Sequence, residues 1–162
     1  MEKILISACL LGENVRYNAE VFLLENEILK NWIKEQRVVS FCPEVSGGLS
    51  IPRLPAEIVN STAKEVLYGK GKVINSIGED ISDNFVKGAK LALEIIKKNN
   101  IKVAILKESS PSCGSNLVYD GTFSKIKKRG KGVTTTLLEE NGIKVYNEKQ
   151  IIEAKQYLEK II

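Results

Sequence analysis

The chain has 162 residues, of which 43% are apolar and 27% are charged, and its formal net charge is +4. This length predicts one domain over 1–162 with a single buried core. Histidine is absent, which excludes Ser-His-Asp triads, Cys-His pairs and HExxH zinc sites and leaves proton transfer to other side chains.

The N-terminal part of the chain predicts a strand, a helix and a second strand. Lys3–Ala8 is a short, mostly apolar run that is typical of a buried strand, and Cys9 follows it directly. Residues 20–35 predict a helix, because apolar side chains recur there at helical spacing, at Val21, Leu24, Ile28 and Trp32. Arg37–Phe41 is the second expected strand, and it ends at Cys42.

The middle of the chain predicts irregular segments around one clear helix. Residues 43–55 are rich in Pro, Gly and Ser and indicate a long ordered loop, a kind of segment that usually has a function. Val66–Tyr68 and Val73–Asn75 flank three residues of Gly-Lys-Gly and suggest a small hairpin or excursion. The apolar periodicity from Ser82 to Asn100 predicts a helix with Ser82 as its cap.

The C-terminal part predicts two more strands and two more helices. Ile101–Leu106 is the third expected strand, and an irregular loop that contains Cys113 follows it. A helix is expected over 133–140, with Thr134 as its cap and Asn141-Gly142 as its end. Residues 143–146 form the fourth expected strand and 148–162 the last helix.

Five basic residues and no acid lie within 125–131, so the positive charge of the chain is local. This run lacks interleaved aromatic residues, which favours a solvated loop over a contact with phosphate or RNA. We therefore expect no nucleic-acid partner.

Strands that alternate with helices predict a three-layer α/β/α, Rossmann-like domain with a mainly parallel sheet. Such folds place their sites beyond the carboxyl ends of the strands. Cys9 and Cys42 each follow an expected strand, and Cys113 lies in the loop after a third. The sequence therefore predicts that all three thiols lie at the C-terminal edge of one sheet.

The three cysteines are few, odd in number and far apart, and no apolar run reaches the length of a signal peptide core or a membrane span. We therefore expect a cytoplasmic protein with no membrane partner. Three roles remain open for the thiols: small buried hydrophobes, a zinc site completed by a carboxylate or water, or ligands of an iron–sulfur cluster. A cluster held by three cysteines leaves one iron without a protein thiolate, which can act as a Lewis acid.

Several long segments resemble the bacterial thiouracil desulfurase family. They occur in the same order over nearly the whole chain: CLLGENVRYN (9–18), FCPEVSGGLSIPRLPAE (41–57), GEDISDNFVKGA (78–89), KESSPSCGSNLVYDGTF (107–123) and GKGVTTTLLEENGIKV (130–145). The resemblance implies a [4Fe-4S] cluster ligated by Cys9, Cys42 and Cys113, with a free iron that takes sulfur from a thiocarbonyl. A thiolated pyrimidine is then the expected small-molecule partner, and uracil and sulfide are the expected products.

Removal of sulfur also requires a base that deprotonates water. Glu44 is the candidate, because it lies two residues after Cys42 and the chain has no histidine; alternatively, it is a loop residue that caps a backbone amide. The pattern of the family points to a serine before Cys113 as a second catalytic group, for which Ser110 is the candidate, with Ser112 as a substrate contact. The candidates for holding the heterocycle are Arg16, Tyr17 and Arg53.

Two other functions use the same cysteines. An iron–sulfur or redox sensor needs the three ligands and a partner surface but no base, and a small zinc-binding module needs no catalytic group at all. A desulfurase differs from both because it requires Glu44 and a serine beside the metal site.

Overall fold

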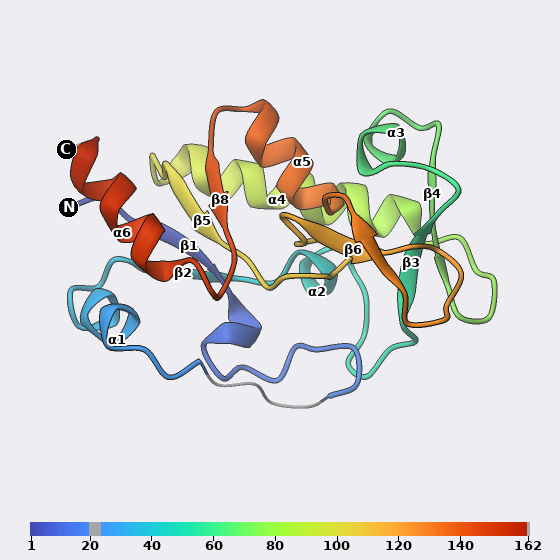
Figure 1. Cartoon of the computed structure of the whole chain (residues 1–162), viewed down its shortest axis with the longest axis horizontal. Coiled ribbons are helices and arrows are strands. Elements are labelled where there is room, and N and C mark those ends of the chain that lie inside the picture. Colours follow the sequence, from blue (N-terminus) through green and yellow to red (C-terminus); the bar gives the residue numbers. More distant parts are fainter. Residues whose placement is uncertain (20–23, 162) are drawn as a thin grey trace.

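The computed structural model describes residues 1–19 and 24–161 (Figure 1). Its central sheet has four strands in the order β2-β1-β5-β8. The strands are β1 (Ile4–Ser7), β2 (Val38–Phe41), β5 (Val103–Ile105) and β8 (Lys144–Tyr146), and all pairings are parallel. All four residues of β1 are buried, as expected for the centre of a sheet that is covered on both faces.

Two pairs of helices cover the two faces of this sheet. Ile4 and Ile6 of β1 pack with side chains of α1 (Glu27–Lys34) and α6 (Ile151–Lys160). Leu5, which points to the opposite face, packs with side chains of α4 (Ser82–Lys98) and α5 (Val133–Glu140). Figure 1 shows α6 near α1 and α5 beside α4. The predicted three-layer α/β/α architecture is confirmed.

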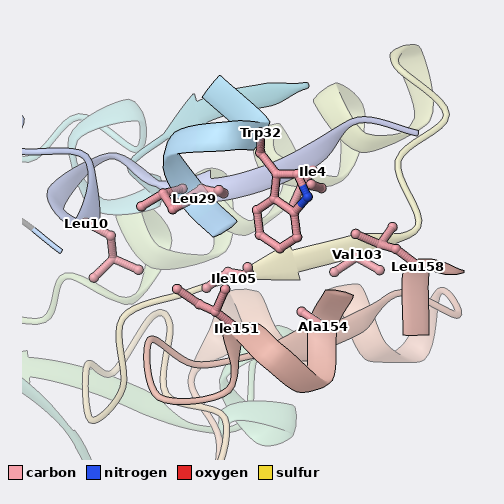
Figure 2. Close-up of a cluster of buried hydrophobic side chains, with 10 residues drawn as sticks. Ile4, Leu10, Leu29, Trp32, Val103, Ile105, Ile151, Ala154 and Leu158 are labelled. Carbon is pink, nitrogen blue, oxygen red and sulfur yellow. The ribbon is translucent and has the colours of Figure 1, made fainter. Parts of the chain in front are cut away.

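The core between the sheet, α1 and α6 contains the single tryptophan. In Figure 2, Trp32 and Leu29 of α1 and Ile151 of α6 gather around side chains of β1 and β5. Only 3% of Trp32 is exposed. The buried side chain of Trp32 joins α1 to the sheet. It explains why apolar residues recur at helical spacing around position 32, since these residues form the face of α1 that packs on the sheet.

Helix α1 begins later than the sequence predicted. The Asn26 side chain accepts a hydrogen bond from the Leu29 backbone N–H at 3.1 Å, so Asn26 is the N-cap and the helix starts at Glu27. Leu24 lies before the helix, where its N–H donates to the Leu10 carbonyl at 3.3 Å. The predicted helical position Val21 lies outside the described residues.

The predicted hairpin around Gly69–Gly71 is wrong. Val66 and Leu67 belong to a short helix, α3 (Ala63–Leu67), whose start is fixed by a capping box between Thr62 and Glu65. The strand after it, β4 (Lys72–Asn75), pairs instead with β3 (Ala56–Val59), which the sequence analysis missed. The Thr-x-x-Glu spacing at 62–65 is the local signal for this helix.

Three segments contain short regular elements that the sequence did not predict. A short helix, α2 (Pro43–Ser46), follows Cys42, and a 3-10 helix over Ala8–Leu10 carries Cys9. Farther along, β6 (Leu117–Tyr119) and β7 (Lys127–Arg129) pair as an antiparallel ribbon. The basic run 125–131 is therefore partly strand, and its three strand residues are exposed.

The predicted ends of α4 and α5 are only partly confirmed. Ser82 is the first residue of α4 rather than its cap, and its hydroxyl accepts the Val73 N–H at 2.9 Å. Gly132, not Thr134, is the N-cap of α5, because the helix begins at Val133; Thr134 lies inside the helix and is fully buried. Gly142 has φ +82° and ends α5 as predicted. In the described part of the chain, no helix is long and apolar enough to cross a membrane.

Candidate functional site

The three cysteines lie at the carboxyl ends of three neighbouring parallel strands. Cys9 follows β1, Cys42 follows β2 directly, and Cys113 lies in the loop after β5. All three are free thiols; Cys113 is buried, whereas Cys9 and Cys42 are half-buried. Burial and Glu44 raise the pKa of Cys113 most, and Cys42 and Cys9 raise it further, which indicates that the three thiols lie near one another.

Burial opposes ionisation of each thiol. Burial and then Cys42 raise the pKa of Cys9 to about 11, and the nearby cations Lys107 and Arg16 oppose this rise. Burial also raises the pKa of Cys42, against a hydrogen bond from the Val45 backbone. The pKa of Cys113 is raised by burial and then by Glu44. The thiols are therefore protonated near neutral pH unless a metal replaces their protons.

The donor set fits an iron–sulfur cluster better than a single zinc ion. Among the described residues, no group of three His, Cys, Asp or Glu side chains is arranged to hold one metal ion. Structural zinc needs four such ligands around one centre, whereas the thiolates of a cluster bind different irons. One buried and two half-buried thiols at one sheet edge, with no imidazole in the chain, fit the ligand set of a cluster.

Glu44 is clamped between two polar side chains beside this edge. It lies in the first turn of α2, where Arg53 Nε donates to its Oε1 at 3.1 Å and Ser110 Oγ donates to its Oε2 at 3.4 Å. The side chains of Arg53 and Glu44 are only 8% and 16% exposed. Helix α2 packs closely on α4, since a Cβ at Gly88 would lie 2.0 Å from the Pro43 carbonyl oxygen.

Ser110 joins Glu44 to the loop that carries Cys113. Its Oγ accepts the backbone N–H groups of Ser112 at 3.0 Å and Cys113 at 2.9 Å. A serine hydroxyl has two acceptor lone pairs and one hydrogen, so with both lone pairs used its hydrogen points to Glu44. The structure therefore brings together the two residues that were predicted as catalytic.

The residues predicted to bind the heterocycle lie near the same edge. Arg16 is close enough to Cys9 to lower its pKa, and the Arg53 N–H donates to the Tyr17 carbonyl at 2.7 Å. Tyr17 is 41% exposed. Arg53 also lines a hollow of about 430 Å³ formed by residues 48–50 and 52–54, Asn75, Glu79 and Ile81. A second hollow, of about 420 Å³, is lined only by α4 and contains none of these side chains.

Comparison with known proteins identifies the family. The family model for 2-thiouracil desulfurase matches residues 4–150. The chain belongs to the 2-thiouracil desulfurase family. It is 42% identical over 148 residues to the uncharacterized protein YbbK of Bacillus subtilis (strain 168), which covers 91% of this chain and 97% of YbbK.

A solved structure described as the [4Fe-4S]-dependent thiouracil desulfidase TudS is also similar. It shares 41% identity with this chain, and the match covers 98% of this chain and 99% of TudS with a TM-score of 0.90. Both the family and the fold predicted from the sequence are therefore confirmed.

Ser112 lies deeper than the sequence predicted. It is completely buried, and its Oγ lies 2.9 Å from Thr134 Oγ1. The backbone of the loop that carries Cys113 is also enclosed, because the first N–H groups of α5 donate to the Pro111 and Ser112 carbonyls at 2.8 and 2.9 Å. This position behind Cys113 does not support a substrate contact by Ser112.

The sequence analysis missed the role of Glu108. Its carboxylate accepts the backbone N–H groups on both sides of the Cys113 loop, namely those of Ser109, Ser115, Asn116 and Leu117, at 2.8–3.2 Å. Burial opposes the ionised form of Glu108, but hydrogen bonds from Asn116, Leu117 and Asn147 stabilise it and lower the pKa of Glu108 to about 2. The signal in the sequence is an acid at a strand end before a loop rich in small polar residues.

Proposed function

We propose that this protein removes sulfur from a thiolated pyrimidine such as 2-thiouracil. The ligands of the required [4Fe-4S] cluster are Cys9, Cys42 and Cys113. Membership of the 2-thiouracil desulfurase family and the similarity to TudS over 98% of the chain support this proposal. The observation that carries it is the hydrogen-bonded arrangement of Arg53, Glu44 and Ser110 beside the three thiols.

The overall reaction replaces a C=S bond by a C=O bond and releases sulfide. Water supplies the oxygen and two protons, so no electrons enter or leave. When bound, a cluster with three thiolate ligands supplies an iron that can accept the sulfur as a Lewis acid. The remaining tasks are to bind the ring, to orient the water and to take its proton, and these fall to side chains of the chain itself.

Glu44 is the proposed base, and its Oε2 is the atom that receives the proton. Arg53 holds the other carboxylate oxygen, so the direction of the carboxylate is fixed before substrate binds. Ser110 already donates to Oε2 and relays a proton between Glu44 and the reacting group. The backbone N–H groups of Ser112 and Cys113 donate hydrogen bonds to Ser110 Oγ, and they also stabilise negative charge on this hydroxyl oxygen.

Arg16, Tyr17 and Arg53 are the proposed binding residues for the pyrimidine. Tyr17 offers an exposed ring face on which a flat heterocycle can stack, and Arg16 adds positive charge on the Cys9 side of the site. Arg53 links this segment to Glu44, because its backbone binds Tyr17 and its side chain binds the carboxylate. Substrate position and base orientation are thereby coupled.

The test is sulfide release from 2-thiouracil by anaerobically reconstituted protein. We expect Glu44→Gln to keep the visible absorption of the cluster and to lose sulfide release by about 100-fold or more. Glu35→Gln is the matched control, because it breaks a different Glu–Arg pair, with Arg37, that precedes β2 at the opposite edge of the sheet.

Full activity of Glu44→Gln would remove Glu44 as the base. Protein with an intact cluster that releases no sulfide from any thiolated pyrimidine would instead favour a sensor. A sensor requires only the three cysteine ligands. The Glu44 carboxylate, held by Arg53 and Ser110, is a further feature that catalysis requires and a sensor does not.

A further inference from the structure

Ser7 is a buried polar residue at the end of the otherwise apolar strand β1. It is 3% exposed, and its hydroxyl donates to Cys113 Sγ at 4.0 Å, which is the longest distance for a hydrogen bond to a sulfur atom. The same hydroxyl accepts the Lys107 backbone N–H at 3.0 Å. Ser7 Oγ acts as an acceptor toward the Lys107 N–H, which uses an oxygen lone pair and not the hydroxyl hydrogen. The single hydroxyl hydrogen of Ser7 is therefore available for the Cys113 sulfur.

The surroundings of Cys113 differ from those of the other two thiols. Cations, Lys107 and Arg16, favour the Cys9 thiolate, and a backbone N–H favours that of Cys42. Cys113 is the most deeply buried of the three, and its sulfur accepts a hydrogen bond from the Ser7 hydroxyl at the end of β1. Hydrogen bonds in such a dry environment act more strongly than at the surface.

We propose that Ser7 is a positioning residue that donates a hydrogen bond to the Cys113 thiolate and thereby sets how firmly this ligand holds its iron. This inference rests on the proposed function, since it assigns Ser7 to the same metal site. Hydrogen bonds to ligand sulfurs draw electron density from them and raise the reduction potential of a cluster. Ser7 also fixes Sγ relative to β1 and β5, because Lys107 follows β5 and holds the hydroxyl in place.

The test compares Ser7→Thr with Ser7→Val in reconstituted protein. These two side chains have nearly the same shape and differ in the hydroxyl, so a loss of packing affects both alike. Ser7→Ala removes the hydroxyl without added volume. Ser115→Ala is the control, because Ser115 is a buried serine whose hydroxyl binds Glu108 rather than a cysteine.

The readouts are the reduction potential of the cluster and the rate at which a chelator removes its iron. We expect the Val and Ala variants to have a more negative potential, because the sulfur no longer shares its electron density with a hydrogen bond. We also expect severalfold faster iron removal from them, because Sγ is no longer held in place, and we expect the Thr and Ser115→Ala variants to match the unchanged protein. Equal potentials in the Thr and Val variants would overturn the role of Ser7 while the proposed function stands. Failure of the unchanged protein to take up iron would overturn both.

Discussion

Replacement of Glu108 by glutamine should loosen the loop that carries Cys113. The carboxylate accepts backbone N–H groups from Ser109 and from Ser115–Leu117, so it ties the two ends of this loop together. Glutamine keeps one acceptor oxygen but places an NH2 group opposite other donors, such as the Asn147 side chain that donates to Oε2 at 2.7 Å.

The expected cost follows from the charge and the geometry. A pKa lowered from 4.5 to about 2 corresponds to at most about 3 kcal/mol, and solvent screening of a half-buried carboxylate reduces this to about 1–2 kcal/mol. The mismatched amide adds about 1 kcal/mol. For a chain of this size, a total of about 2–3 kcal/mol lowers the melting temperature by roughly 5–10 °C.

The assay is thermal unfolding of the metal-free protein, followed by circular dichroism between pH 7 and pH 2. Because the folded pKa of Glu108 is lowered, its stabilisation is present above about pH 4.5 and is lost as the pH falls toward 2. The difference between the unchanged protein and Glu108→Gln should therefore shrink over this range. Glu94→Gln, on the exposed face of α4, is the control. A shift below about 1 °C at pH 7, or a difference that does not depend on pH, would refute the role of Glu108.

Two further predictions concern the core and the site. Trp32→Ala should destabilise the protein by about 3–5 kcal/mol in urea unfolding because its side chain is buried between α1 and the sheet, whereas Ile33→Ala, at a position 49% exposed, should cost less than about 1 kcal/mol. Equal costs would contradict the packing described. Arg53→Lys should lower kcat for sulfide release about tenfold or more with unchanged cluster absorption, since lysine cannot hold Glu44 Oε1 and the Ser50 carbonyl in the same geometry. Arg37→Lys is its control, and equal kcat values for the two variants would show that Arg53 does not orient the base.

The parts of the fold that follow from local pattern could be predicted. Lys3–Ala8 and Arg37–Phe41 are apolar runs of strand length, and each ends at a cysteine, so a parallel sheet sufficed to place Cys9 and Cys42 at one edge. The convergence of Glu44 with Ser110 could be proposed from their positions next to these cysteines, and the structure brings the two within 3.4 Å.

The remaining features depend on partners far away in the chain. The strand β3 pairs with β4 although helix α3 lies between them in the chain, and four residues are too few for a periodicity that would show this pairing. The direction of the Ser112 side chain is set by Thr134, 22 residues away, and the role of Glu108 depends on backbone N–H groups that only the folded loop presents. The hydrogen bond from Ser7 to Cys113 spans 106 residues and has no local signal at all.

The most direct test of the proposed site is the iron and acid-labile sulfide content of anaerobically purified protein, measured together with sulfide release from 2-thiouracil. A [4Fe-4S] cluster on Cys9, Cys42 and Cys113 predicts roughly four irons per chain and sulfide release, with both lost when any one of the three is replaced by serine. Colourless protein that binds one zinc per chain after anaerobic reconstitution, or iron content unchanged by these replacements, would contradict it.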